Sequence, residues 1–128
     1  MKESPLYDAR LVASILHQIG AAIDDMLLWN KDVSSAEDYY ASAEGMKTLA
    51  ATSMLLEAIG ESVKRIENMT QGTLFVLRPE IPWTEIMGMR NHIAHGYFDI
   101  DTELIFDTIK NDLEPLKTAI DFLEAQFQ

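Results

Sequence analysis

Side chains that can act on a phosphate gather in one short stretch of this chain, Met87–Phe98. Arg90 and His95 stand five residues apart there, and Tyr97 follows two residues later. The stretch contains no Asp or Glu, although the chain of 128 residues has 21 of them. A histidine can move a proton near neutral pH, and an arginine can stabilise developing charge on a phosphate. We therefore take this stretch as the candidate site of chemistry.

Helical geometry limits how Arg90 and His95 can cooperate. On an ideal α-helix, residues five positions apart are separated by roughly 140° around the axis. The two side chains therefore do not face one point unless the helix relaxes at Gly96 or a second copy of the chain contributes. A two-fold dimer that places two such helices together would supply both groups, so we expect a C2 homodimer.

Each of these residues also has a purely structural interpretation. As a cation, His95 can stabilise the C-terminal end of a helix. Arg90 can pair with an acidic neighbour such as Glu85 or Asp99, and Tyr97 can be a core aromatic residue whose hydroxyl reaches water. The residue types alone leave both interpretations open.

The remaining histidines give weaker signals. His92 lies three residues before His95, on a neighbouring helical face, where it would support the catalytic pair from behind or lie on the surface. His17, between Leu16 and Ile19 on a helix flank, is interpreted as structural. No third ligand accompanies His92 and His95 at suitable spacing, so we expect no metal site and no cofactor.

Composition excludes several classes of protein. The formal net charge is −11 and the sequence pI is about 4.5, a balance that repels phosphate backbones at long range and by itself argues against nucleic-acid binding. Any nucleic-acid role must then rely on a local cationic site, and we expect no DNA partner. The chain has no cysteine, which excludes disulfides and thiol catalysis. Charges near Met1 where a signal peptide needs apolar residues, and the lack of about 20 unbroken apolar residues, predict a cytoplasmic protein without a membrane span.

The elements that position the candidate site are predicted to be helices. Apolar residues recur at steps of three and four over Tyr7–Trp29 and again over Ala43–Asn68. Between them, Ser34 or Ser35 can cap a short helix. The run T-L-F-V-L-R-P-E-I-P-W at 73–83 is the strand-like part of the chain, and its prolines favour a connecting loop.

Two further helices follow this loop. One begins near Pro82 or Trp83 and ends at Gly96. The last is capped by Asp101, and Pro115 should kink it near Asn111. The sequence thus predicts an all-α fold: an up-and-down bundle of four main helices plus a short one, in a single domain over residues 1–128.

A family resemblance rests on the order of several motifs. Residues 90–97 read R-N-H-I-A-H-G-Y, an R-x4-H motif extended to R-x4-H-x-Y. Upstream stand E-A-I-G-E at 57–61 and P-E-I-P-W at 79–83, and downstream N-D-L-E-P at 111–115. In this order on an all-helical chain, they resemble the HepT-like toxins of the HEPN superfamily over nearly the whole chain.

The resemblance implies a metal-independent endoribonuclease toxin of a type VII (HEPN/MNT) toxin–antitoxin system. It implies a homodimer that acts on RNA by attack of the 2′-hydroxyl, with Arg90 and His95 as the catalytic pair. Asn91 would orient the substrate or His95. It also implies a partner, a nucleotidyltransferase antitoxin of the MntA type, which silences the toxin by adenylylating Tyr97.

A second class of function stays open. The chain can instead be a non-catalytic, dimeric helical partner of a nucleotidyltransferase. The charge of −11 favours this alternative, whereas the complete set of Arg90, His95 and Tyr97 favours the ribonuclease.

Overall fold

The structure, a computed structural model, describes residues 6–93 and 99–128, and these residues form helices and connecting turns without a strand. The helices in chain order are α1 (Ala9–Trp29), the 3-10 helix η1 (Ala36–Tyr40), α2 (Ala43–Thr70), the 3-10 helix η2 (Phe75–Leu77), α3 (Trp83–Met87), α4 (Met89–Ile93), α5 (Thr102–Asn111) and α6 (Leu113–Ala125). The prediction of an all-α fold is confirmed.

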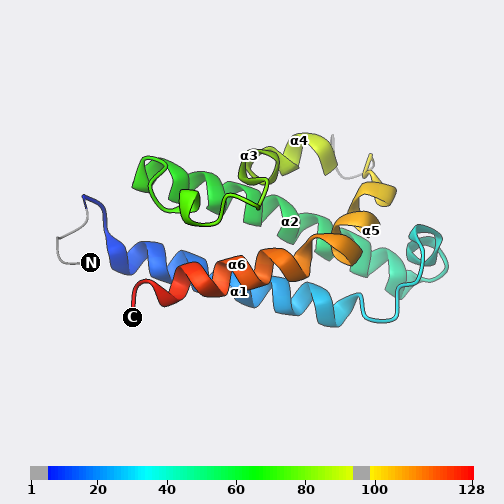
Figure 1. Ribbon diagram of the computed structural model, residues 1–128. Helices are drawn as coiled ribbons and strands as arrows, with labels where there is room; N and C mark the ends of the chain where they lie inside the picture. The colour runs from blue at the N-terminus through cyan, green and yellow to red at the C-terminus, as the bar shows by residue number, and fades with distance from the viewer. Residues whose placement is uncertain (1–5, 94–98) are drawn as a thin grey trace.

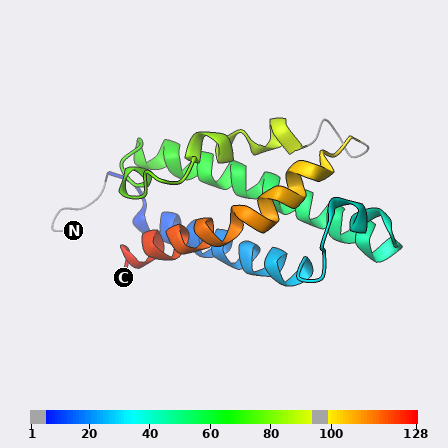
Figure 2. The same ribbon diagram turned by 45° about the vertical axis from the view of Figure 1, so that its right-hand side comes forward.

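The helices are arranged around α2. Helices α1 and α6 lie side by side along one flank of α2, and α3 and α4 cover another (Figure 1). Helix α5 leads from the end of α4 back to α6, so that α6 ends beside the beginning of α1 (Figure 2). The core between these layers consists mainly of Ile and Leu side chains from α1, α2, α5 and α6.

Helix α1 forms where the periodic apolar pattern predicts it. Asp8 caps its N-terminus, since the Asp8 carboxylate accepts a 3.1 Å hydrogen bond from the Leu11 N–H. Its buried face carries the residues of the apolar stripe, Val12, Ile15, Leu16, Ile19, Gly20, Ile23 and Met26. The capped start and the single buried stripe are those of a helix packed on one side against a core.

By length and composition, α1 also resembles a membrane span, contrary to the sequence expectation that the chain has none. It is 21 residues long with a mean hydropathy of 1.4 over its most apolar window. In the structure, however, this apolar face packs against α2 and α6. On its outer side, Asp24 pairs with Lys117 of α6, with 3.3 Å between Oδ1 and Nζ. We therefore interpret α1 as a core helix of the bundle.

Buried polar side chains join α1, η1 and α2. Asn30, at the end of α1, is 1% exposed. Its side-chain amide donates to the Met26 carbonyl (2.8 Å) and to Thr52 Oγ1 (3.0 Å), and its Oδ1 accepts a 2.6 Å hydrogen bond from the Tyr39 hydroxyl. Burial raises the pKa of Tyr39 to about 12, so that its hydroxyl stays protonated as the donor. Of the two predicted caps of η1, Ser35 is the one used.

The helix predicted to run from Pro82 or Trp83 to Gly96 is not continuous in the structure, which corrects that expectation. Helices α3 and α4 have five residues each and are separated by Gly88. Because the helix is interrupted, the backbone of α3 can pack closely against Gly60 of α2. A Cβ added at Gly60 would lie only 2.6 Å from the Ile86 carbonyl oxygen. Gly96, the predicted end, lies outside the described residues.

The break in the last helix is confirmed. Helix α5 ends at Asn111, α6 begins at Leu113, and Asp112 joins them. Pro115 thereby falls in the first turn of α6, where its missing N–H costs no hydrogen bond. Asp101 caps α5 as predicted, because its carboxylate accepts a 3.1 Å hydrogen bond from the Leu104 N–H. The connecting loop is confirmed too, with Trp83 stacked on Phe75 at 4.1 Å between ring centroids.

Candidate functional site

Helix α4 presents the first part of the R-x4-H motif to solvent. Ile93 is 1% exposed and anchors the helix in the core, with Met89 packed beside it. Arg90, Asn91 and His92 are all exposed. The other two motif residues, His95 and Tyr97, lie outside the described residues, so the predicted pairing of Arg90 with His95 stays a prediction.

Two contacts fix α4 against the bundle. At one end, the close approach to Gly60 sets the distance between α4 and α2, because an added Cβ would lie 3.3 Å from Met89 Cβ. At the other end, the Ile93 carbonyl accepts a 2.7 Å hydrogen bond from the Asp101 N–H. These two contacts hold the helix that carries Arg90 between α2 and the beginning of α5.

Arg90 makes no ion pair with the carboxylates of the described residues. In particular, neither Glu85 nor Asp99, both of which are described, forms an ion pair with Arg90. An exposed guanidinium without a carboxylate partner keeps its fork of N–H donors for a phosphate. In a chain of net charge −11, such a local cation is what phosphate binding would need.

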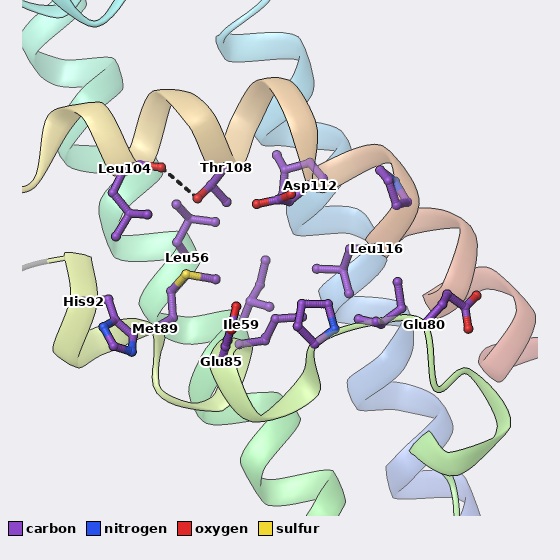
Figure 3. Close-up of a pocket in the computed structure, with 15 residues that line it drawn as sticks. Leu56, Ile59, Glu80, Glu85, Met89, His92, Leu104, Thr108, Asp112 and Leu116 are labelled. Carbon is purple, nitrogen blue, oxygen red and sulfur yellow. Dashed lines mark hydrogen bonds between the residues drawn. The ribbon is translucent and has the colours of Figure 1, made fainter.

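On the other side of α4 lies a groove of about 500 Å³ (Figure 3). Its floor is formed by Leu56 and Ile59 of α2. Glu85, Met89 and His92 lie on one side of the groove, and Leu104, Thr108, Asp112 and Leu116 lie on the other. The remaining lining residues are Glu80, Ile81, Pro82, Ile86, Leu113 and Pro115. Arg90 and Asn91 do not line it. We call this cavity the α4–α5 groove.

His92 faces the groove, and Arg90 does not. Residues two positions apart on an α-helix are rotated by about 160° from one another, so the two side chains leave α4 on nearly opposite sides. His92 lines the groove, whereas its predicted role behind the catalytic pair depends on His95, outside the described residues. His17 is exposed and pairs with Glu124 across α1 and α6, with 3.0 Å between Nδ1 and Oε2, which fits the structural interpretation.

Acidic groups give the groove a negative character. The pKa of Asp112 lies above its ordinary value of 3.8, first because of partial burial and then because Asp107 and Glu85 repel its negative charge. Glu80, by contrast, has the guanidinium of Arg78 beside it. No group of three or more His, Asp or Glu side chains in the described part of the chain is placed to hold a metal ion.

Comparison with known proteins identifies the family. The family described as Ribonuclease HepT-like matches residues 21–123, which include the whole motif stretch and both walls of the α4–α5 groove. The chain belongs to this family. The predicted resemblance to HepT-like proteins is thereby confirmed.

Individual relatives of the HepT-like chain carry matching names. A "Probable ribonuclease HepT" of Thermococcus cleftensis is 41% identical over 71 residues, which are 56% of this chain and 61% of that protein. Two proteins of Methanocaldococcus jannaschii match over more of their length: "Putative RNase MJ1380" is 29% identical over 89% of this chain and 97% of its own, and "Putative RNase MJ0125" is 30% identical over 84% and 86%. No solved structure matches the chain.

The groove is the feature of this HepT-like protein that sequence reasoning missed. Glu85 lies on α3, whereas Thr108 and Asp112 lie four residues apart at the end of α5, and no spacing in the sequence links these two segments. Only the packing of α5 against α4 brings these segments face to face. The arginine, in contrast, could be found because a short motif carries it.

Proposed function

We propose that this HepT-like protein is a metal-independent endoribonuclease that uses Arg90 and His95. The observation that carries the proposal is the family match across the complete R-x4-H-x-Y motif. The exposed Arg90, without a carboxylate partner among the described residues, supports it. Asn91, exposed beside Arg90, would orient the substrate or His95.

The proposed reaction needs only groups that the RNA and the protein supply. The 2′-oxygen attacks the adjacent phosphorus, the bond from phosphorus to the 5′-oxygen breaks, and the products are a 2′,3′-cyclic phosphate and a 5′-hydroxyl. His95 accepts the 2′-hydroxyl proton or delivers a proton to the leaving 5′-oxygen. Arg90 stabilises the additional negative charge on the phosphorane.

A second copy of the chain completes the proposed site. The angular separation of Arg90 and His95 on one helix favours a homodimer in which the motifs of both copies share one cleft. Such a dimer should bury at least about 1,000 Å² in total. A stable monomer at micromolar concentration in light scattering would contradict the shared site.

The proposed regulation acts on Tyr97. A nucleotidyltransferase antitoxin of the MntA type would transfer AMP from ATP to the Tyr97 hydroxyl and release pyrophosphate. Tyr97 is two residues from His95 in sequence, so the added phosphate would repel RNA and its nucleoside would block the cleft. In this proposal the protein is the toxin of a cytoplasmic toxin–antitoxin pair.

RNA cleavage in EDTA tests the proposal. Unmodified wild-type protein, confirmed by intact mass, should cut a mixed RNA pool and leave cyclic phosphate ends, while His95→Ala should not. His17→Ala is the matched control, because it removes an exposed histidine and only a surface ion pair, and it should cut like the wild type.

The same experiment decides the alternative function. The net charge of −11 favours a non-catalytic dimeric partner of a nucleotidyltransferase. If unmodified wild-type protein cuts no RNA, the ribonuclease proposal fails and this alternative takes its place. If His95→Ala cuts as well as wild type, the proposed catalytic role of His95 is wrong.

A further inference from the structure

The α4–α5 groove has the form of a binding site for a small molecule. Its volume of about 500 Å³ lies within the range of roughly 300–1,000 Å³ that is usual for such sites. It has a floor and two walls, and most of its lining is apolar. An apolar body can therefore bury itself there, between Leu56, Met89 and Leu116 (Figure 3).

The polar groups of the groove call for a positive charge. Glu85 and Asp112 line opposite walls, and neither makes an ion pair with the described residues. They lie near enough for Glu85 to perturb the titration of Asp112. Among the described residues, no Lys or Arg lines the groove, so the described lining offers these two carboxylates no permanently charged partner.

A hydroxyl completes the polar set. Thr108 Oγ1 donates its proton to the Leu104 carbonyl at 2.8 Å, as Figure 3 shows. Its lone pairs are then left to accept a hydrogen bond from a ligand inside the groove. Glu85, Thr108 and Asp112 are thus acceptors, which matches an ammonium group with its several N–H donors. Of the other polar lining residues, Glu80 pairs with Arg78, and His92 lies on α4.

From this arrangement we propose that the α4–α5 groove binds a small organic amine. The ammonium group lies between Glu85 and Asp112, and the apolar body packs on Leu56 and Ile59. A phosphate-bearing ligand is excluded by the same two carboxylates, whose charges would repel it. The site is independent of the proposed ribonuclease, because Arg90 lies on the other side of α4.

The choice of a small ligand over a partner helix follows from size. The groove holds about 500 Å³, the volume of a small-molecule site, whereas a helix with its side chains is about 10–12 Å across. An amine with a body of one ring fits such a space. Binding of this amine would also relieve the repulsion between Asp112 and Glu85.

Methyl NMR with matched probes tests the amine site. The probes are 4-phenylbutylamine, 4-phenyl-1-butanol and 4-phenylbutyrate, which share one apolar body and differ in charge. The amine should shift the methyl signals of Leu56, Ile59 and Met89 in a saturable way. The alcohol should bind at least about tenfold more weakly, since it lacks the charge-assisted hydrogen bonds, and the acid should not bind.

Two variants and a control locate the charge. Glu85→Gln and Asp112→Asn should each weaken amine binding by about tenfold or more, while Glu103→Gln should leave it unchanged. Glu103 is exposed on α5 and does not line the groove. Circular dichroism confirms that all three variants fold, and RNA cleavage by them should match wild type.

Several outcomes would overturn the amine site. It fails if the alcohol binds as well as the amine, because the groove then selects only apolar bodies. It also fails if the shifts appear at methyl groups outside the groove, or if no probe binds because a second copy of the chain covers the groove. None of these outcomes affects the cleavage experiment, so the two proposals are tested separately.

Discussion

Two regions of the molecule differ in whether their polar side chains find partners within the chain. The first is the buried cluster of Asn30, Tyr39 and Thr52, which we call the α1–η1–α2 joint, and the second is the surface around α4. At the joint, Asn30, Tyr39 and Thr52 satisfy one another's hydrogen bonds in a site closed to water. Around α4, Arg90 on one side and Asp112 on the other are left without ion pairs among the described residues. Groups satisfied inside the chain stabilise the fold, whereas groups left open are available to a substrate or ligand.

Removal of the open arginine should give the largest effect. We expect Arg90→Ala to reduce RNA cleavage by about 100-fold or more, as loss of a transition-state donor usually does, with little change in the free energy of unfolding. Arg65→Ala, at an exposed arginine of α2, should retain cleavage. Cleavage rates and urea unfolding of both variants check this, and equal cleavage by the two would contradict a role for Arg90.

The support of α4 should be broken by a single methyl group. In Gly60→Ala the new Cβ would stand 2.6 Å from the Ile86 carbonyl oxygen, so α3 and α4 must shift. Overpacking of this kind costs about 1–3 kcal/mol in the free energy of unfolding. Gly20→Ala is the control, because its Cβ would meet Lys117 at 3.5 Å and should be neutral or stabilising. Similar losses in both variants would show that the contact at Gly60 is not tight.

The stability of the α1–η1–α2 joint should depend on the hydroxyl of Tyr39. Tyr39→Phe leaves the buried Oδ1 of Asn30 without its donor, which costs about 1–3 kcal/mol. Tyr40→Phe should cost less, because Tyr40 is 59% exposed and water can replace its hydroxyl. Urea unfolding at neutral pH compares the two variants, and equal losses would mean that burial of the hydroxyl is not what matters.

The stability that Tyr39 contributes at this joint should also depend on pH in the alkaline range. The pKa of Tyr39 is about 12 in the folded protein against an ordinary value of 10, so the unfolded chain loses this proton first. The stability that depends on the protonated hydroxyl is complete below pH 10 and is lost as the pH rises through about 12. The difference in stability between wild type and Tyr39→Phe should therefore narrow over this range.

The smallest effect is expected at the groove. The pKa of Asp112 is raised in the folded protein, so its stabilising protonated form is complete below the ordinary pKa of 3.8 and is lost as the pH rises through the raised value. Asp112→Asn should therefore be slightly more stable than wild type at pH 7. Its free energy of unfolding, measured with urea, should be higher by about 0.5 kcal/mol or less, because Asp112 is exposed and solvent screens the repulsion. The two proteins should converge in acid, and a less stable variant at pH 7 would contradict the repulsion.

The sequence predicted the helices that carry their own signals. Periodic apolar residues located α1 and α2, the predicted caps at Ser34 or Ser35 and at Asp101 located η1 and α5, and Pro115 located the break before α6. The interruption at Gly88 was missed, because glycine inside a helix can be tolerated and the reason for the break lies on another helix, at Gly60.

In the candidate site too, the sequence predicted the part that a local motif carries and missed the part that long-range packing forms. Arg90 was predicted because a local motif carries it, and the structure shows it exposed on α4. The α4–α5 groove could not be predicted, since Glu85 and Asp112 become neighbours only when α5 packs against α4 and α2. Long-range packing of this kind leaves no regular spacing in a single sequence.

The pairing of α1 with α6 has a consequence for the order in which the protein is made. Helix α1 leaves the ribosome first of the described helices and α6 last, yet each covers a large part of the other's apolar face. Contacts between segments so far apart in the chain form late. During translation the apolar side of α1 therefore stays incompletely covered until α6 has been made and has packed against it.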